Sequence, residues 1–198
     1  MTLRRTPPGL RPTLPHWAVV IPERVEHIQR VAELAAGWAE RMGVPDSERN
    51  RWLRAVWLHD ALRDASLAEL DKWAAGIAWP AELRHGPASA AHAKAEGETD
   101  RGVLDAVRYH SLGLAEWDMV GRMLYCADYL DPGRGFDETQ RAELAERLPD
   151  DPGGVLREVA RSRLTHIIQS GWPVLEPTIR FWNSLAAAGA SSHSLPPS

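Results

Sequence analysis

The chain has 198 residues, of which 44% are hydrophobic and 25% are charged, and this composition is typical of one globular domain with a sizeable core. Its net charge is −4 and its acidic and basic residues are interspersed, which argues against a protein that binds nucleic acid or an anionic membrane surface. The single cysteine excludes a disulfide framework, and no run reaches about 18 apolar residues, so we expect a cytoplasmic protein without a transmembrane helix.

The first quarter of the chain changes from a proline-rich segment to helical patterns. Prolines resist both helix and sheet, and four of them among the first fifteen residues predict a flexible tail over residues 1–15. A first helix is predicted from Pro22, because proline suits a first turn, to a break at Gly43. Asp46 is predicted to cap a second helix that extends to about Leu62. The buried stripe of the first helix is predicted to be His27, Val31, Leu34 and Trp38.

The remaining segments are short helical patterns that glycine and proline separate. Ser66 and Glu69 form a capping-box signature for a third helix. No strand-period run is long enough to predict a sheet, so the fold is predicted to be all-α, with a single domain over residues 16–190 and a second flexible tail over residues 191–198. The helices predicted after Leu62 cover residues 67–75, a short turn between Pro80 and Pro87, and residues 88–96, 100–110, 116–130, 137–147, 154–170 and 176–188.

The dyad His59-Asp60 is the first feature that indicates chemistry. Trp52, Val56 and His59 follow one another at steps of four and three, so His59 projects from a helix face that should be buried. A buried carboxylate without a partner costs several kcal/mol, so the charge of Asp60 needs compensation. A metal ion is one of the few adequate candidates.

Other histidines and one more carboxylate lie on inward helix faces or at helix ends. Each alone is most simply a hydrogen-bonded core residue, but together they would leave several buried polar groups unsatisfied unless they converge. Imidazole and carboxylate suit iron, manganese, zinc or cobalt, and six ligands fit two metals bridged by a carboxylate, as in two-metal hydrolases. The candidate ligands are His27, His59, Asp60, His85, His110 and Asp128.

The order of these residues resembles the signature of HD-domain phosphohydrolases, which is a histidine, then an HD dyad, then a distant aspartate. Three segments also resemble the narrower bacterial YqeK group, the HD-domain symmetrical diadenosine tetraphosphate hydrolases. The segment 85–90 is similar to its H-A/G-P motif and the segment 126–134 to its A-D-Y-hydrophobic-acid-P-x-R motif, and the third segment is 104–111. The resemblance extends from about Arg24 to Phe136.

The resemblance implies an HD-domain helical bundle with a buried di-metal site. One metal would be held by His27, His59, Asp60 and Asp128, and the second by the bridging Asp60 with His85 and His110. The expected cofactors are two divalent transition-metal ions, with iron as the expected metal and manganese, cobalt or zinc as alternatives. The chain departs from the usual pattern at Val25, Ile28 and Arg63, where an aromatic residue, a threonine and a lysine are usual.

The resemblance implies symmetrical hydrolysis of diadenosine tetraphosphate to two ADP by a metal-activated water. Asp60 and Arg63 are the expected catalytic residues, and Arg63 and Arg134 are expected to bind the substrate phosphates. The expected partner is a small nucleotide, with no nucleic acid and no membrane, and a homodimer is left open.

Two other functions remain open from the sequence. One is another HD-domain nucleotide phosphohydrolase, which would need only the first set of ligands, so that His85 and His110 discriminate against it. The other is a non-catalytic helical domain that binds a nucleotide. His92 and His166 have no counterpart in the family motif and lie outside the predicted site, and Trp17 has no predicted place.

Overall fold

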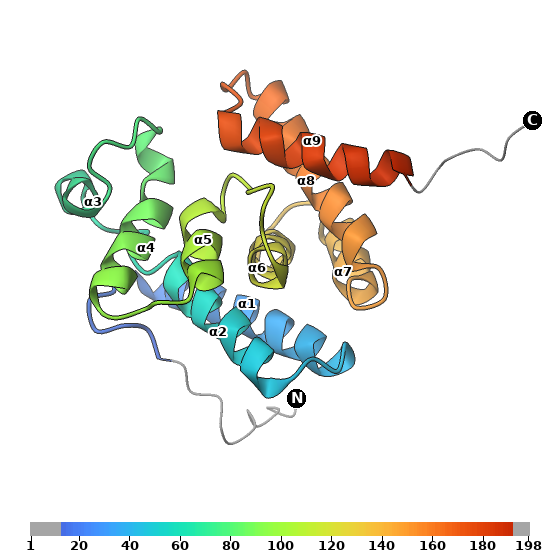
Figure 1. Ribbon diagram of the computed structural model, residues 1–198, viewed down its shortest axis with the longest axis horizontal. Helices are drawn as coiled ribbons and strands as arrows, with labels where there is room; N and C mark the ends of the chain where they lie inside the picture. Colours follow the sequence, from blue (N-terminus) through green and yellow to red (C-terminus); the bar gives the residue numbers. More distant parts are fainter. Residues whose placement is uncertain (1–12, 192–198) are drawn as a thin grey trace, which may run out of the picture.

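The computed structural model describes residues 13–191, and every regular element within them is helical, which confirms the predicted all-α fold (Figure 1). Residues 1–12 and 192–198, which make up most of the two predicted tails, lie outside the described residues. The elements in order are α1 (Pro22–Arg41), α2 (Asp46–His59), α3 (Leu67–Trp73), η1 (Ala81–Leu83), α4 (His85–Ala95), α5 (Arg101–Tyr109), α6 (Met119–Leu130), α7 (Glu138–Arg147), α8 (Pro152–Gln169) and α9 (Glu176–Ser191).

Helix α6 lies at the centre of the bundle. It packs against α1, α2, α5, α7 and α8, and residues around its whole circumference are buried, among them Val120, Leu124 and Ala127. The stripe predicted on α1 faces this core: His27, Val31 and Trp38 are buried, while Leu34 is only partly buried. A helix that is apolar on all sides belongs at the centre of a bundle, because each face meets a partner.

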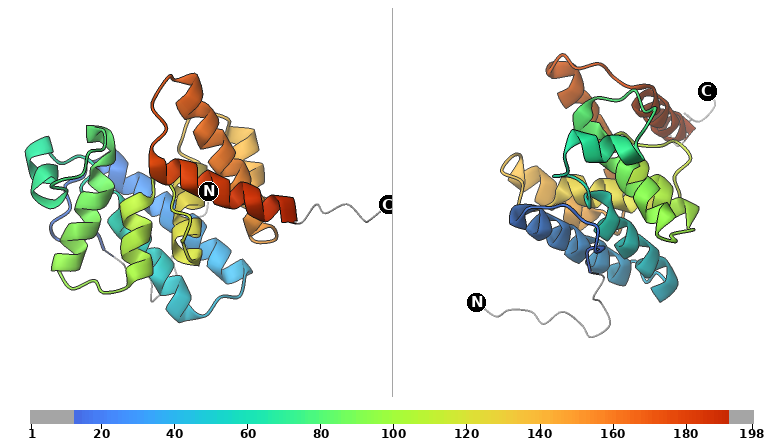
Figure 2. Two further views of the ribbon diagram at one scale, coloured as in Figure 1. Left: turned by 45° about the horizontal axis from the view of Figure 1, so that its top comes forward. Right: turned by 90° about the vertical axis from the view of Figure 1, so that its left-hand side faces the viewer.

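Helices α8 and α9 cover one side of the bundle, where α9 crosses α8 (Figure 2). Phe181 of α9 packs against Trp117 and Tyr125, with ring centroids 5.3 Å apart in each pair. The turn after α5 reaches this position through Gly113, whose φ is +91° and where a Cβ would lie 2.1 Å from the ring of Phe181. Glycine is required at this turn for both reasons.

The predicted helix starts are confirmed where a side chain caps the helix. The Ser66 hydroxyl accepts a hydrogen bond from the backbone N of Glu69 at 3.2 Å, and the Asp100 carboxylate accepts from the backbone N of Gly102 at 3.0 Å. Each bond satisfies one of the backbone N–H groups that a helix start leaves unpaired.

Other predicted starts were wrong by one to three residues. Asp46 is the first residue of α2, not its cap, and makes no capping bond. Helix α4 begins at His85 instead of residue 88, because Pro87 fits within a first turn, where its missing N–H needs no partner. Helix α6 begins at Met119 instead of residue 116, because Asp118 caps it by accepting from the backbone N of Val120 at 3.0 Å.

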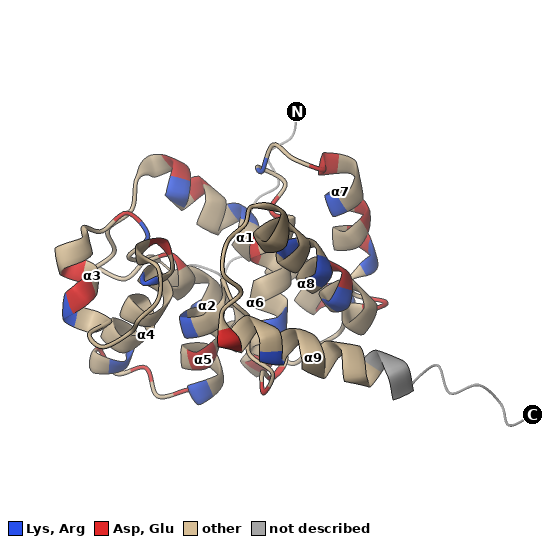
Figure 3. Cartoon of the chain, turned by 90° about the horizontal axis from the view of Figure 1, so that it is seen from above, with Lys and Arg blue, Asp and Glu red and all other residues tan. Residues whose placement is uncertain are grey.

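Charged residues of both signs are mixed over the helices, as the sequence predicts (Figure 3). Arg51 of α2 contacts Asp100 and Asp118, at the starts of α5 and α6, each at 2.7 Å. None of the helices in residues 13–191 has the length and apolar character that crossing a membrane requires. The cytoplasmic setting stays a prediction.

Candidate metal centre

The structure brings all six predicted ligands into one buried cluster near the middle of the bundle. They come from five helices or the residues that end them, and the exposed fraction of each is between 0% and 6%. The residues and their positions are His27 on α1, His59 and Asp60 at the end of α2, His85 at the start of α4, His110 just after α5 and Asp128 on α6.

The end of α2 sets the positions of the dyad. His59 is the last helical residue and is fully buried, while Asp60 has left the helix with φ −108° and ψ 14°. The hydroxyl of Ser89 on α4 accepts a hydrogen bond from the backbone N of Leu62 at 3.2 Å and holds the turn that follows. Because the helix stops between them, the two side chains enter the cluster from different directions.

Gly86 brings the other two histidines together. A Cβ on Gly86 would lie 2.9 Å from the backbone O of Arg108 and 3.3 Å from Cε1 of His110. The start of α4 can approach the end of α5 this closely only without a side chain at residue 86. His85 and His110 therefore face each other, with their Nε2 atoms 3.0 Å apart.

The four imidazoles share one orientation, in which Nδ1 is bonded outward and Nε2 points into the cluster. Nδ1 donates to the backbone O of Val56 in His59 (2.6 Å), of Glu82 in His85 (2.8 Å) and of Val107 in His110 (2.8 Å). Nδ1 of His27 lies 2.7 Å from Oδ2 of Asp131. A backbone carbonyl can only accept, so in His59, His85 and His110 Nδ1 carries the proton and Nε2 is left with a free lone pair.

Asp60 lies between two pairs of histidines, and each of its oxygens faces one pair. Oδ2 is 3.7 Å from Nε2 of His59 and 3.9 Å from Nε2 of His27. Oδ1 is 3.3 Å from Nε2 of His85 and 3.6 Å from Nε2 of His110. The cluster thus contains two ligand triads of the kind that can hold a metal ion, and Asp60 belongs to both. The first triad is His27, His59 and Asp60, and the second triad is Asp60, His85 and His110.

The donor atoms of the cluster fit divalent cations. The Nε2 lone pairs of His85 and His110 are 3.0 Å apart, and Oδ1 of Asp60 lies beside them. These atoms repel one another unless a cation or a proton lies between them. On the other side of Asp60, Nε2 of His27 and Nε2 of His59 are buried and have no hydrogen-bond partner among the described residues. Buried polar atoms without partners are rare in folded proteins, and shared cations would satisfy these.

The protonation states of the dyad also suit metal binding. Burial lowers the pKa of His59 to about 4, although Asp60 opposes it, so the imidazole is neutral near pH 7. Burial alone would raise the pKa of Asp60, but the neighbouring His59, His110 and His85 hold it well below its ordinary value. A neutral imidazole and an ionised carboxylate are the forms that bind metals.

Asp128 is held by two arginines. Arg134 contacts its Oδ1, and Arg163 of α8 donates to its Oδ2 at 2.8 Å. Burial raises the pKa of Asp128, but Arg134 and Arg163 outweigh this effect and keep it well below its ordinary value. Oδ1 of Asp128 also lies 3.2 Å from Nε2 of His27, so this carboxylate borders the first triad.

The predicted phosphate-binding arginines differ in their surroundings. Arg134 also donates from Nε to the backbone O of Asp128 at 2.9 Å, and its side chain is 35% exposed. Arg63 follows the dyad and donates to the backbone O of Glu82 at 3.2 Å, the same oxygen that accepts from His85. Arg63 therefore lies beside the second triad without bonding to its ligands.

Three residues of the centre were not predicted as site residues. Arg24 donates to Oδ2 of Asp60 at 3.0 Å, and Asp131 accepts from His27. Asp131 belongs to the segment 126–134 and Arg24 begins the range of the family resemblance, so their positions could have indicated them. Arg163 follows Leu156 and Val159 on the buried stripe of α8, and an arginine in such a stripe is the only signal that could have found it.

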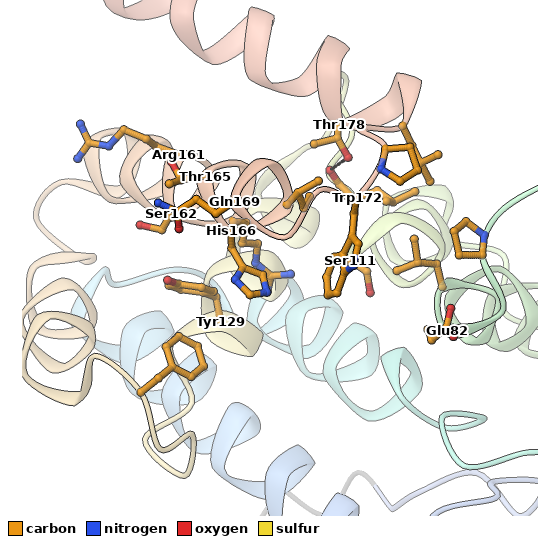
Figure 4. Close-up of a pocket in the computed structure, with 18 of the residues that line it drawn as sticks. Glu82, Ser111, Tyr129, Arg161, Ser162, Thr165, His166, Gln169, Trp172 and Thr178 are labelled. Carbon is orange, nitrogen blue, oxygen red and sulfur yellow. Dashed lines mark hydrogen bonds between the residues drawn. The ribbon is translucent and has the colours of Figure 1, made fainter.

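A cleft of about 1210 Å³ opens beside the cluster, between α8 and its C-terminal turn on one side and η1 and α6 on the other (Figure 4). Glu82 and Arg163, which bond to His85 and Asp128, both line it. Ser111 and Tyr129, which follow His110 and Asp128 in the chain, line it as well.

Comparison with known proteins gives concordant results. The model of the HD domain family matches residues 24–133, more than half of the chain. A protein of Bacillus subtilis (strain 168) named "Bis(5'-nucleosyl)-tetraphosphatase, symmetrical" is 29% identical over 172 residues, which cover 83% of this chain and 90% of that protein. A protein of Staphylococcus aureus (strain NCTC 8325 / PS 47) with the same name is 28% identical over 171 residues, which cover 80% and 85%.

One solved structure has the same fold. It is the crystal structure of a protein from Clostridium acetobutylicum described as a predicted HD superfamily hydrolase involved in NAD metabolism. The two structures superpose with a TM-score of 0.73 over 84% of this chain and 90% of that chain, at 23% sequence identity. At this identity the likeness concerns the fold alone.

Proposed function

This chain belongs to the HD domain family, and on that basis we propose that it is a metal-dependent phosphohydrolase that cleaves diadenosine tetraphosphate symmetrically into two ADP. The observation that carries the proposal is Asp60, whose two oxygens each face a pair of histidines with inward Nε2 atoms. The substrate class follows the two relatives named symmetrical bis(5'-nucleosyl)-tetraphosphatases, each of which aligns over at least 80% of this chain.

We propose that the centre holds two divalent transition-metal ions with Asp60 as the shared ligand. The first set of ligands would be His27, His59, Asp60 and Asp128, and the second Asp60, His85 and His110. Iron is the expected metal, and manganese, cobalt and zinc suit the same donors. When bound, such ions polarise a phosphate oxygen and lower the pKa of water from 15.7 to about 7, which supplies a nucleophile at neutral pH.

The chain's own residues orient this centre. Arg24 holds Oδ2 of Asp60, and Asp131 holds the ring of His27 by its Nδ1. Carboxylate and carbonyl acceptors behind metal-binding histidines fix the ring orientation and make Nε2 more basic. Arg134 and Arg163 fix the carboxylate of Asp128 by donating hydrogen bonds to it, as Arg24 does for Asp60.

Positive side chains beside the centre would bind the substrate's phosphates. Arg63 is partly exposed at the second triad, and a guanidinium binds phosphate oxygens in a bidentate fork. Arg134 is bonded through Nε and Nη2, and its exposed fraction of 35% leaves the guanidinium accessible to a phosphate. The chain as a whole carries a net charge of −4 and does not attract anions. The positive charge of Arg63 and Arg134 must therefore attract the anionic substrate locally.

The second triad favours this function over other activities of the family. A nucleotidase that uses one metal would need only the set around His27 and His59. His85 and His110, whose Nε2 atoms converge on Asp60 at 3.3 and 3.6 Å, have no role in such an enzyme. They would also be unnecessary in a non-catalytic nucleotide-binding domain.

A product assay tests the proposal. The metal-loaded protein is incubated with diadenosine tetraphosphate and the products are separated by anion-exchange chromatography. ADP should be the only nucleotide released, and an Asp60→Asn variant should release none. AMP together with ATP would reveal asymmetric cleavage, and intact substrate would indicate a domain that binds the nucleotide without cleaving it. Either result would contradict the proposal.

A further inference from the structure

Two aromatic side chains outside the metal centre have no partner in the hydrophobic core of residues 13–191. They are His166, near the end of α8, and Trp172, in the turn that follows it. Trp172 is 59% exposed, and its ring meets that of His166 edge to face, with the ring centroids 5.5 Å apart at 90°. Aromatic side chains exposed at a cleft are typical of ligand-binding sites, which are lined mainly by hydrophobic and aromatic residues.

Both rings line the cleft beside the metal centre. In Figure 4 they extend from the α8 side into the space between Tyr129 and the pair Ser111 and Glu82. Glu82 and Arg163, which bond to His85 and Asp128, also line the cleft, so it lies next to the metal centre and extends from there to the aromatic pair. A molecule whose phosphates lie at the centre would therefore extend toward Trp172.

The cleft has the size and lining of a nucleotide site. Its volume of about 1210 Å³ lies slightly above the range of about 300–1,000 Å³ that is common for small-molecule sites, so one nucleoside fits within it. The charged residues Glu82 and Arg163, which bond to His85 and Asp128, lie at the end of the cleft next to the metal centre, and the aromatic pair lies at the C-terminal end of α8. A phosphate chain suits the first of these surroundings and a nucleobase suits the second, because aromatic side chains stack on base faces.

We propose that this cleft binds one nucleoside of the substrate, with the nucleobase packed against Trp172 and His166. The inference rests on the proposed function, because the metal centre sets where the phosphates lie. The aromatic pair then determines affinity for the nucleoside, while Arg63 and the metal ligands act on the phosphates. His166, which the family motif does not include, belongs to the substrate site in this assignment.

Calorimetric titration of the metal-loaded protein tests the site with two probes, ADP and inorganic pyrophosphate, which lacks the nucleoside. Trp172→Ala should weaken ADP binding about 5- to 150-fold, the range that loss of one base–aromatic stack gives. It should leave pyrophosphate binding unchanged. Trp172→Phe should retain most of the ADP affinity, because it keeps an aromatic face, and His166→Ala should weaken ADP binding less than Trp172→Ala.

The matched control is Ile168→Ala. Ile168 lies on α8, as His166 does, and is 62% exposed, but it is not among the cleft-lining residues in the described part of the chain. Its replacement should change neither titration. The inference is overturned if Trp172→Ala binds ADP as the wild type does, if it loses pyrophosphate to the same extent, or if Ile168→Ala weakens ADP equally.

The same titrations separate this inference from the proposed function. If the wild type binds ADP in a Trp172-dependent way but releases no ADP from diadenosine tetraphosphate, the nucleoside site stands and the proposed reaction fails. If the wild type produces ADP and Trp172→Ala has an unchanged KM, the reaction stands and the nucleoside site is wrong.

Discussion

Asp131 shows how a residue that binds no metal can determine whether a ligand is ready to bind one. Its Oδ2 lies 2.7 Å from Nδ1 of His27, and its Oδ1 accepts from Arg30 at 2.7 Å. Asp131 is 1% exposed, so water does not compete for these bonds. The ring of His27 therefore keeps one orientation, with Nε2 directed at Asp60 and Asp128.

Replacement of Asp131 by Asn should weaken metal binding without removing a ligand. The amide keeps the shape of the side chain but loses the charge that makes His27 more basic, and such replacements commonly cost about 10- to 100-fold in metal affinity or activity. Metal titration followed by the product assay would measure the loss. Asp150→Asn is the control, because its side chain is 80% exposed at the surface. Equal affinity in both variants would contradict the role of Asp131.

The protonation of His27 predicts that metal binding depends on pH. In the metal-free chain burial lowers its pKa, but Asp128 and Asp131 outweigh burial and raise the pKa from 6.5 to about 9. The charged ring therefore stabilises the metal-free fold below pH 6.5, and this contribution is lost as the pH rises through about 9. A metal must displace the same proton to bind Nε2.

Metal affinity should accordingly increase from pH 6.5 to 8.5, with about one proton released for each metal bound at His27. Calorimetry at pH 7.5 in buffers of different ionisation enthalpy counts the released protons. His92→Ala, which changes a histidine outside the centre, should release the same number. Metal binding that releases no proton at pH 7.5 would show that His27 is neutral or is not a ligand.

At the scale of elements, the approach of α4 to α5 determines the second triad. In Gly86→Ala the new Cβ would lie 2.9 and 3.0 Å from the backbone oxygens of Arg108 and Val107, which cannot move as a side chain can. Helix α4 must shift, and His85 should separate from His110. We expect the metal content of the purified protein to fall from two ions per chain to about one.

The control for Gly86→Ala is Gly37→Ala. Gly37 is also helical, but a Cβ there would have no atom of the described residues within 4 Å. This replacement should stabilise the protein by about 0.5–1 kcal/mol, because alanine restricts the unfolded chain, and should leave two metals bound. If Gly86→Ala also retains two metals, the second triad does not depend on this contact.

A stack of three rings joins the segment before α1 to α3 and α4. The ring of His92 lies between those of Trp17 and Trp73, with centroid distances of 4.2 and 4.0 Å and interplanar angles of 17° and 14°. Each aromatic pair is worth about 0.5–1.5 kcal/mol beyond its buried area. The stack holds α3, which otherwise contributes mainly to the small cluster of Leu62, Leu70, Ala74 and Ala88.

His92→Ala should therefore lower the free energy of unfolding by about 1–3 kcal/mol, while His92→Phe should restore most of it by keeping an aromatic ring. Urea denaturation measures both. Lys94→Ala, at an exposed position of the same helix, should have little effect. Neither variant of His92 should change the products of the reaction. If His92→Ala is as stable as the wild type, the stack does not stabilise the fold.

Local signals predicted the elements better than their ends. Helical periodicity alone indicated α1, α2 and α6, because their apolar residues recur every three or four positions. The predicted start of α6 at residue 116 was wrong by three residues, because Asp118 makes the capping bond and the helical pattern does not mark the capping residue. Trp17 had no predicted place because its contact with His92 joins residues 75 positions apart.

At the scale of the whole molecule, the six candidate ligands and their division into two sets around Asp60 followed from the family resemblance, but the geometry of the site could not be predicted. Motif positions identify a histidine, while the distances between the four Nε2 atoms and the two oxygens of Asp60 depend on how five helices pack. The cleft was not predicted, because Arg163 and Trp172 come to line it only when α8 packs against α6. Its lining residues are separated by up to 98 positions, from Pro80 to Thr178.

Because the cluster joins five helices, metal binding should stabilise the whole bundle. A ligand that binds only the folded chain adds about 2.7 kcal/mol at a free concentration of 100 times its Kd. After chelation, the unfolding temperature should therefore increase with the logarithm of added metal. Asp60→Asn should remove this dependence, because it weakens both triads at once, while Asp46→Asn at an 89% exposed side chain should retain it. A wild type whose unfolding temperature does not respond to metal would mean that protons, and not cations, satisfy the facing lone pairs of His85 and His110.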